Sequence, residues 1–300
     1  MTAQADSGHV RPRLSVVLPA LNEARNLPHV FARLPSDLHE VILVDGHSVD
    51  GTVDVARRLR PDVQIVVQSR RGKGNALACG FTAATGDIIA MLDADGSTDP
   101  GEIPQFMKVL LDGADFAKGT RFAAGGGSHD ITRLRSLGNR ALSVLVNVCY
   151  GTRYSDLCYG FNVFWRRIVP LLGLDAASPP PAQGKRRLWG DGFEIETLIN
   201  IRVARAGLTV AEVPSVEHAR IHGVSNLSAP RDGLRVLRTI VCESPLFARF
   251  ARRPLRGNAA SARASPTPLP RVAVTARMTC CPTNPIQIAN GNQSSEGDGK

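Results

Sequence analysis

The feature that most constrains this chain is a regular alternation of short apolar runs with helical patterns over its first 120 residues. The runs LSVVLPA, HEVILVD, VQIVVQ, DIIAMLD and ADFAKGT predict strands. Between them, NLPHVFARL, DGTVDVARRL, GKGNALACGFTAA and PGEIPQFMKVLL predict helices. Strands separated by helices of this length form βαβ units, and strands that are apolar throughout suit a sheet covered on both faces. The pattern predicts an α/β fold with a doubly wound, mostly parallel sheet and helices on both faces.

The rest of the chain divides into a continuation of this domain and a tail. Helices are predicted over 133–148, 193–206 and 231–250, and TVAEVP predicts one more strand. From residue 251 the sequence is rich in Ala, Ser, Pro, Thr, Gly and Arg and has no periodicity, which is typical of disorder. We therefore expect a flexible N-terminus over 1–12, a single domain over 13–250 and a disordered basic tail over 251–300.

Composition narrows the class of protein. Hydrophobic residues make up 43% of the chain and charged residues 21%, which is the range of globular proteins. The N-terminus lacks the apolar segment of an export signal, and no apolar run approaches the roughly 20 residues that a membrane span needs. The six cysteines show no C-x-x-C spacing. A reduced, cytoplasmic protein is expected.

The net charge of +9 raises the possibility of a nucleic-acid-binding module. However, the tail holds seven basic and two acidic residues, so it carries +5 of that charge. Single-strand nucleic-acid sites also interleave basic with aromatic residues, and only 5% of this chain is aromatic. We expect no nucleic-acid partner, although a basic binding module remains the non-enzymatic alternative.

Polar residues follow the predicted strands at the points where the strands end. They are Asn22 and Glu23, Asp45, Arg70 and Arg71, and the pair Asp93 and Asp95. Ligands of such sheets bind beyond the carboxyl ends of the strands. Two carboxylates at one strand end repel each other unless a cation holds them, and oxygen ligands favour Mg²⁺ or Mn²⁺. A D-x-D pair alone also occurs in solvated turns, so the motif needs further support.

Eight stretches in a fixed order give that support. They are SVVLPALNE (15–23), EVILVDGHSVDGT (40–52), RRGKGNALACGF (70–81), DADGSTDP (93–100), GTRF (119–122), SDLCYGFNVF (155–164), GFEIETL (192–198) and AEVPSVEHARIHGVSNL (211–227). With these stretches the chain resembles the family-2 glycosyltransferases of the GT-A fold, in particular the dolichyl- or polyprenyl-phosphate mannose synthases. The resemblance implies a GT-A domain, a Rossmann-like variant of the sheet predicted above.

The resemblance also implies roles for single residues. In such enzymes the positions of Pro19, Asn22, Glu23, Asp45 and Lys73 line the nucleotide pocket. Asp93 and Asp95 match the pair that holds Mg²⁺ or Mn²⁺ and the diphosphate, and Ser97 matches a further metal contact. Arg121 matches an arginine that meets the acceptor phosphate, and Arg220 one that clamps the donor diphosphate.

The implied reaction is metal-dependent, inverting transfer of a hexose from a GDP- or UDP-sugar to a polyprenyl phosphate at the cytoplasmic face of the membrane. A phosphate acceptor needs no general base, because its second pKa is about 6. The alternative, a hydroxyl acceptor of cell-envelope or exopolysaccharide synthesis, needs one, and Asp156 is the first candidate, ahead of Asp191 and Glu196. Gly46 and Asn226 depart from the family's pattern, so the sugar and the base stay open.

Two of the predicted helices are basic and amphipathic. Helix 133–148 carries Leu134, Leu137, Ala141, Val144, Leu145 and Val148 on one stripe, with arginines nearby. Because it follows three glycines and Arg121, we expect an interfacial helix that admits the lipid acceptor. Helix 231–250 separates three arginines from Leu234, Leu237, Ile240 and Val241, and a face that covers the core is expected.

Overall fold

The structure is a computed structural model that describes residues 11–179, 188–223 and 229–244. The chain divides into units 1–254 and 255–300, and every described residue belongs to the first unit. The predicted flexible segment 1–12 lies almost entirely outside the described residues, and the predicted tail 251–300 lies entirely outside them. Both assignments therefore stay predictions.

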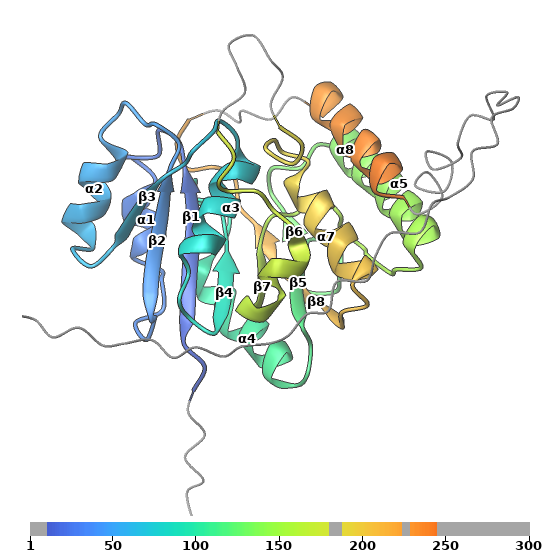
Figure 1. Cartoon of the computed structure of the whole chain (residues 1–300), viewed down its shortest axis with the longest axis horizontal. Helices are drawn as coiled ribbons and strands as arrows, with labels where there is room; N and C mark the ends of the chain where they lie inside the picture. The colour runs from blue at the N-terminus through green and yellow to red at the C-terminus, as the bar shows by residue number, and fades with distance from the viewer. Residues whose placement is uncertain (1–10, 180–187, 224–228, 245–300) are drawn as a thin grey trace, which may run out of the picture. The chain divides into compact units, whose positions relative to one another are not determined.

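The alternation of strands and helices predicted for the first 120 residues is confirmed (Figure 1). The strands are β1 (Leu14–Ala20), β2 (Glu40–Asp45), β3 (Gln64–Val67), β4 (Ile88–Met91), β5 (Phe116–Thr120), β6 (Gly127–Ser128), β7 (Asn162–Trp165), β8 (Val210–Pro214) and β9 (Val216–Glu217). The helices are α1 (Leu27–Phe31), α2 (Thr52–Leu59), α3 (Lys73–Ala83), α4 (Ile103–Leu111), α5 (Arg133–Tyr150), α6 (Val169–Leu172), α7 (Ile195–Arg205) and α8 (Ala229–Glu243).

The described strands form a seven-stranded sheet in the order β3-β2-β1-β4-β7-β5-β8 and a small parallel pair of β6 with β9. All neighbours in the large sheet are parallel except β7, which runs antiparallel to both β4 and β5. The mostly parallel sheet is as predicted, whereas β7 is a strand that the sequence pattern does not reveal.

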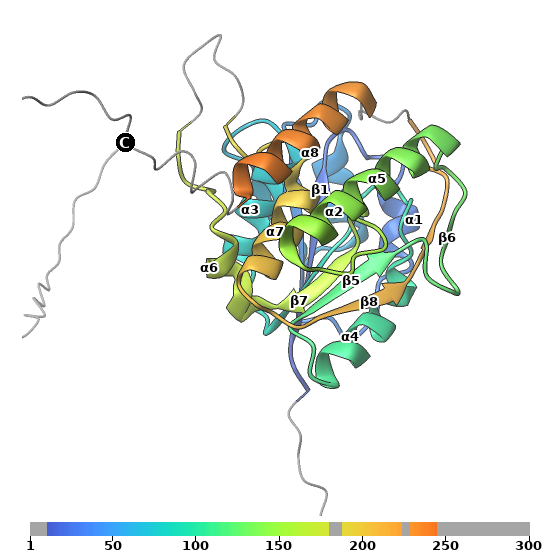
Figure 2. The ribbon, with the colours of Figure 1, turned by 90° about the vertical axis from the view of Figure 1, so that its right-hand side faces the viewer.

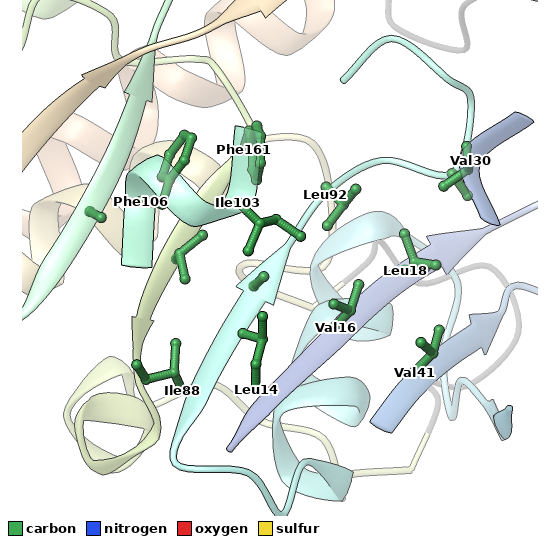
Figure 3. Close-up of a cluster of buried hydrophobic side chains, with 14 of the residues drawn as sticks. Leu14, Val16, Leu18, Val30, Val41, Ile88, Leu92, Ile103, Phe106 and Phe161 are labelled. Carbon is green, nitrogen blue, oxygen red and sulfur yellow. The ribbon is translucent and has the colours of Figure 1, made fainter. Parts of the chain in front are cut away.

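The strands β1, β2, β4 and β5 are buried on both faces, which explains why they are largely apolar, whereas the edge strand β3 is partly exposed. Successive side chains of a strand point to opposite faces, so Val16 and Leu18 pack with α1 and α4 while Val17 packs with α3 and α7. On the first face, Phe106 of α4 stacks on Phe161 with ring centroids 4.3 Å apart (Figure 3). The two layers fix the strand ends that carry the polar residues.

The strand order reverses between β1 and β4, because the chain proceeds from β1 towards β2 and β3 on one side and places β4 on the other. In open α/β sheets such a switch point leaves a crevice beyond the carboxyl ends of the strands, and ligands bind there. Glu23 follows β1 and Asp93 follows β4, so both flank this crevice.

A third apolar cluster joins α7 to α5 and α8, which lie side by side at the surface (Figures 1 and 2). It contains Val146 of α5, Ile201 of α7, and Val236 and Ile240 of α8. The prediction that Ile240 faces the core is confirmed, but Leu234 and Leu237 are 69% and 41% exposed, so that part of the prediction is wrong. Within the described ranges, no helix has both the length and the hydropathy of a membrane span.

Candidate active site

The turn after β4 carries Asp93, Asp95 and Ser97. Gly96 within it has φ +79°, and a Cβ there would lie 2.6 Å from the Ile221 side chain, so the turn requires glycine. Ile221 belongs to the segment after β9, which lies over the turn: the His218 amide donates to the Ser97 carbonyl at 2.8 Å. Asp95 is 8% exposed, and its Oδ1 accepts a hydrogen bond from the Ser97 amide. The fold therefore fixes this carboxylate before any ligand arrives.

Arg220 spans the crevice between β1 and β4. Its Nη1 lies 3.1 Å from Oε1 of Glu23, and its Nη2 lies 2.7 Å from Oδ2 of Asp95. Burial raises the pKa of Glu23, although hydrogen bonds from Asn26 and Arg220 act in the opposite direction. One guanidinium thus holds together two carboxylates that follow different strands.

Lys73, the first residue of α3, contacts Asp93, the other carboxylate of the turn after β4. Its Nζ lies 2.6 Å from Oδ1 of Asp93 and 2.7 Å from Oε1 of Glu196, which is in the first turn of α7. Burial alone would lower the pKa of Lys73, but the two carboxylates raise it overall, so the lysine stays charged. Burial also raises the pKa of Glu196, although Lys73 opposes this.

The position of Lys73 depends on close backbone packing at the start of α3. A Cβ on Gly72 or Gly74 would lie 1.9 Å from the Asp191 carbonyl oxygen or 1.7 Å from that of Gly190, so only glycine fits. Arg70 donates to both carboxylate oxygens of Asp191, at 2.9 and 2.8 Å. Both carboxylate oxygens of Asp191 thus bind Arg70 and stabilise the segment before α3, so Asp191 is a poor candidate for a general base.

The residues predicted to contact the nucleotide lie at the ends of β1 and β2. The Asn22 side chain accepts from the Val49 amide, and the Asp45 carboxylate accepts from the amides of His47 and Ser48. Pro19 lies within β1, beside Val44 of β2 in the parallel register. These contacts order the loop that follows β2, at the edge of the crevice.

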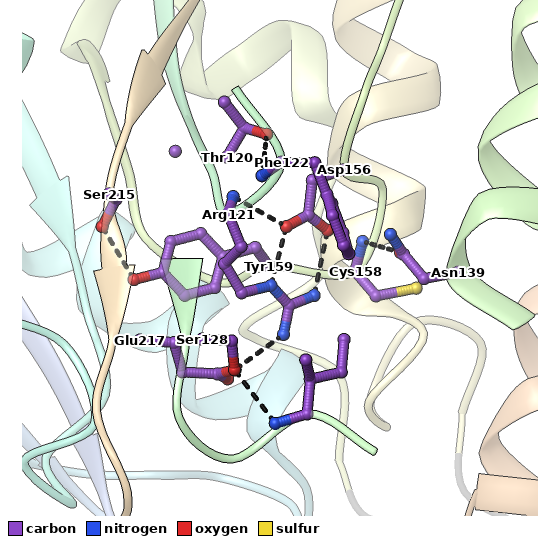
Figure 4. Close-up of polar contacts among 12 residues, drawn as sticks. Thr120, Arg121, Phe122, Ser128, Asn139, Asp156, Cys158, Tyr159, Ser215 and Glu217 are labelled. Carbon is purple, nitrogen blue, oxygen red and sulfur yellow. Dashed lines mark hydrogen bonds and ion pairs between the residues drawn. The ribbon is translucent and has the colours of Figure 1, made fainter. Parts of the chain in front are cut away.

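Arg121, at the end of β5, is held by two carboxylates (Figure 4). Its Nε and Nη2 donate to the two oxygens of Asp156 at 2.7 and 3.0 Å, and its Nη1 donates to Glu217 of β9 at 3.0 Å. The guanidinium also lies 5.0 Å from the centre of the Tyr159 ring. Burial acts to raise the pKa of the fully buried Asp156, but the hydrogen bonds and charge of Arg121 outweigh it and lower the pKa. Asp156 is thus a partner that orients Arg121.

A cavity of about 600 Å³ brings most of these groups together. The predicted site residues that line it are Lys73, Asp93, Asp95, Ser97, Arg121 and Arg220. The predicted residues outside its lining are Pro19, Asn22, Glu23, Asp45 and Asp156, of which Glu23 and Asp156 each pair with an arginine that lines it. Asn226 lies outside the described residues.

The cavity has a second end between α5 and α8, which is called its apolar end below. Its apolar lining is Ile131, Leu134 and Leu142 from α5 and the residues before it, and Val236 from α8; the charged residues Asp130, Arg135 and Asp232 of the same segments also line the cavity. Asn139 also lines this part and is 5% exposed, and its Nδ2 has no hydrogen-bond partner among the described residues. Sequence reasoning missed Asn139 and Glu217, because neither stands in a recognisable catalytic pattern.

The donor set suits a divalent cation that also binds a phosphate ligand. Asp93 and Asp95 line the cavity, but the described residues contain no group of three or more His, Cys, Asp or Glu side chains arranged to hold a metal. Mg²⁺ is commonly bound by one or two carboxylates together with substrate phosphates and waters, rather than by a complete protein cage. Asp93 and Asp95, with Ser97 nearby, fit that arrangement.

Comparison with known proteins agrees with this geometry. The family model described as "Glycosyl transferase family 2" matches residues 15–170 of this chain. An uncharacterized glycosyltransferase of Mycobacterium tuberculosis is 44% identical over 108 residues, which are 36% of this chain and 48% of that protein, so the match spans about half of the relative's length. Glycosyltransferase AglJ of Haloferax volcanii is 29% identical over 239 residues, covering 77% of this chain and 73% of that protein.

Solved structures give the same fold. Glucosyl-3-phosphoglycerate synthase from Mycobacterium tuberculosis in complex with Mn²⁺ and UDP-glucose aligns with a TM-score of 0.59 at 24% identity, over 78% of this chain and 79% of that one. Its complex with Mn²⁺, UDP and glucosyl-3-phosphoglycerate aligns with a TM-score of 0.57 at 22% identity, over 78% and 80%. The predicted GT-A-like fold is confirmed. Since the family match covers more than half of its residues, the chain belongs to glycosyl transferase family 2.

Proposed function

We propose that this protein is a metal-dependent, inverting hexosyltransferase that moves a sugar from a nucleotide diphosphate to a polyprenyl phosphate, working peripherally at the inner face of the cell membrane. The observation that carries the proposal is the two-part cavity. Its charged end holds Asp93, Asp95 and Arg220, and its apolar end lies between α5 and α8. A donor diphosphate suits the first end, and a phosphate with a hydrocarbon chain suits the second.

The proposed binding site of the nucleotide sugar donor is the crevice between β1 and β4. Structures of glucosyl-3-phosphoglycerate synthase contain UDP with Mn²⁺ or Mg²⁺, which supports a nucleotide diphosphate sugar and a divalent cation for this chain. Asp93 and Asp95 would hold the cation, which when bound neutralises charge on the departing diphosphate. Arg220 would leave its pairing with Asp95 and donate to the diphosphate, since a guanidinium fork matches phosphate oxygens.

The proposed ligands of the acceptor phosphate are Arg121 and Asn139. Arg121 presents its guanidinium at the cavity, and the unpartnered Nδ2 of Asn139 is a donor that a phosphate oxygen would satisfy. A phosphate oxygen forms the new bond to the anomeric carbon as the bond to the diphosphate oxygen breaks, and the electron pair leaves with the nucleoside diphosphate. A single displacement inverts the anomeric carbon, and a phosphate dianion needs no base.

The hydroxyl-acceptor alternative is less well supported because its base is not free. Both carboxylate oxygens of Asp156 accept from Arg121, and those of Asp191 accept from Arg70. Glu196 does line the cavity with a raised pKa, which is a property of a general base, but it pairs with Lys73.

The test is incubation of the purified protein with a panel of labelled nucleotide sugars, Mg²⁺ or Mn²⁺, and a short polyprenyl phosphate. We expect label in the organic extract from one donor. The variant Arg121→Lys, which keeps the charge and loses the fork, should reduce transfer more than hydrolysis of the donor. Transfer to a soluble hydroxyl compound, with none to the lipid phosphate, would refute the proposed acceptor.

A further inference from the structure

Four apolar residues of α5 are exposed, and one of them, Leu134, also lines the cavity. Leu134, Leu137, Val144 and Val148 are 76%, 67%, 55% and 79% exposed, although they recur every three to seven residues along one side of the helix. An amphipathic helix that only covers a core places such a stripe inward. Covering the core therefore does not account for these four exposed residues of α5.

The inward side of α5 is held by apolar and polar contacts. Val146 belongs to the apolar cluster with α7 and α8, and Leu142, Leu145 and Tyr150 of α5 pack against that cluster, while Asn139 and Ser143 are buried beside them. Asn139 accepts from the Cys158 amide at 3.0 Å, and so ties α5 to the domain through a polar contact. The helix is fixed in this orientation, and the outward apolar residues take no part in holding it.

The neighbouring helix α8 extends the same surface. Leu234 and Leu237 are exposed on it, while Val236 and Ile240 anchor the helix to the core. Figures 1 and 2 both show α5 and α8 next to one another at the edge of the domain. Together the two neighbouring helices expose six leucines and valines, and exposed apolar residues that gather in one place mark interaction sites.

The exposed charge on these two helices is positive in excess. Exposed arginines lie on both helices: Arg133 and Arg140 on α5, and Arg231, Arg235 and Arg238 on α8. Helix α5 contains no acidic residue. Of the acidic residues of α8, the buried Asp232 pairs with Arg235 at 3.2 Å and so offsets one of these five arginines, while Glu243 pairs with Arg202 and Arg205 of α7. Leucines and valines bordered by arginines suit a layer with an apolar interior and anionic headgroups.

We propose that the outward faces of α5 and α8 form one docking surface for an anionic lipid bilayer. The apolar side chains enter the headgroup boundary and the arginines contact lipid phosphates. The apolar end of the cavity lies between the same two helices, so docking would bring its opening to the membrane surface. The inference deepens the proposed function, yet vesicle binding requires neither donor nor acceptor, so the two can fail separately.

The test measures binding of the full chain to vesicles by flotation, with phosphatidylcholine alone or with 30% phosphatidylglycerol. The fluorescence of Trp189 gives a second readout, because the Arg238 guanidinium lies 5.3 Å from its ring. Wild type should bind the anionic vesicles. Arg133→Gln with Arg140→Gln should weaken binding roughly 30-fold, at about 1 kcal/mol for each arginine. Leu137→Ser with Val144→Ser should weaken it by at least about 10-fold, since both lose buried apolar area.

Matched controls separate this surface from general charge and hydrophobicity. Arg57→Gln with Arg58→Gln alters two exposed arginines of α2, and Val49→Ser alters a valine that is 89% exposed elsewhere. Both should bind as wild type does. Wild-type binding by the α5 variants would overturn the proposal, as would equal binding to neutral vesicles. A lipid-free dimer that Leu137→Ser converts to a monomer would show instead that the surface joins two copies of the chain.

Discussion

The pairing of Arg121 with Asp156 gives a quantitative test of how the cavity is built. Asp156→Asn keeps the size of the side chain but removes its charge, which leaves Glu217 as the only charged partner of Arg121 among the described residues. Asp156 is fully buried and the Arg121 side chain is 5% exposed, so solvent can replace the lost partner only in part. Breaking a buried pair in this way costs about 3–5 kcal/mol. In a domain of this size, that corresponds to a melting temperature lower by at least about 6 °C.

The assay is thermal and urea unfolding followed by circular dichroism. The matched control is Asp62→Asn, because Asp62 also pairs with an arginine but its side chain is 68% exposed. An exposed pair contributes less than about 1 kcal/mol. A melting temperature within 1–2 °C of wild type for Asp156→Asn, accompanied by loss of transfer, would refute the reasoning and favour Asp156 as a base.

The pH dependence of this pair has a definite sign. Burial acts to raise the pKa of Asp156, but Arg121 lowers it overall in the folded protein. The charged pair therefore stabilises the fold above the ordinary aspartate pKa of about 3.9, and this stabilisation is lost as the pH falls through the lower folded value. The difference in stability between wild type and Asp156→Asn should be constant at neutral pH and shrink below about pH 4.

Two further predictions concern packing and the crevice. Gly80→Ala should lower the free energy of unfolding by about 1–3 kcal/mol, because its Cβ would lie 2.4 Å from the buried Val17 side chain. Gly138→Ala should raise the free energy of unfolding by about 0.5–1 kcal/mol, because a Cβ there would have no atom within 4 Å. Equal effects of the two variants in urea unfolding would contradict this prediction. Arg220→Gln should tighten the binding of Mn²⁺ without nucleotide, because the Arg220 guanidinium no longer competes for Asp95. The same variant should weaken the binding of a nucleoside diphosphate about 10- to 100-fold in calorimetry. Weaker binding of both ligands would contradict the role given to Arg220.

The first half of the fold could be predicted because its signals are local. Each strand up to β5 is a short, largely apolar run and each helix shows its own periodicity, and the polar residues at the strand ends follow from the rule for parallel sheets. The strand β7 could not be predicted in this way. It has four residues and inserts antiparallel between β4 and β5, in register with residues far away in the sequence such as Ile89.

Only those residues of the candidate site that stand in a sequence motif could be predicted. The sequence identifies Asp93 and Asp95 by their place after a strand, but nothing local predicts that Arg220 contacts Glu23, 197 residues away. The stripe on α5 shows the same limit. The positions of Leu134 and Leu137 predict which side of the helix is apolar, whereas their exposure depends on the layers packed behind the helix.

The central claim is that Asp95 and a divalent cation jointly bind the donor diphosphate, and calorimetric titration of UDP and GDP with and without Mn²⁺ tests it most directly. Asp99→Asn is the control, because Asp99 lies in the same segment but caps the turn at Pro100–Glu102. We expect Mn²⁺ to tighten nucleotide binding at least about 10-fold, the scale of one charged hydrogen bond, in wild type and Asp99→Asn and to have no effect on Asp95→Asn. Equal tightening in Asp95→Asn would contradict the account.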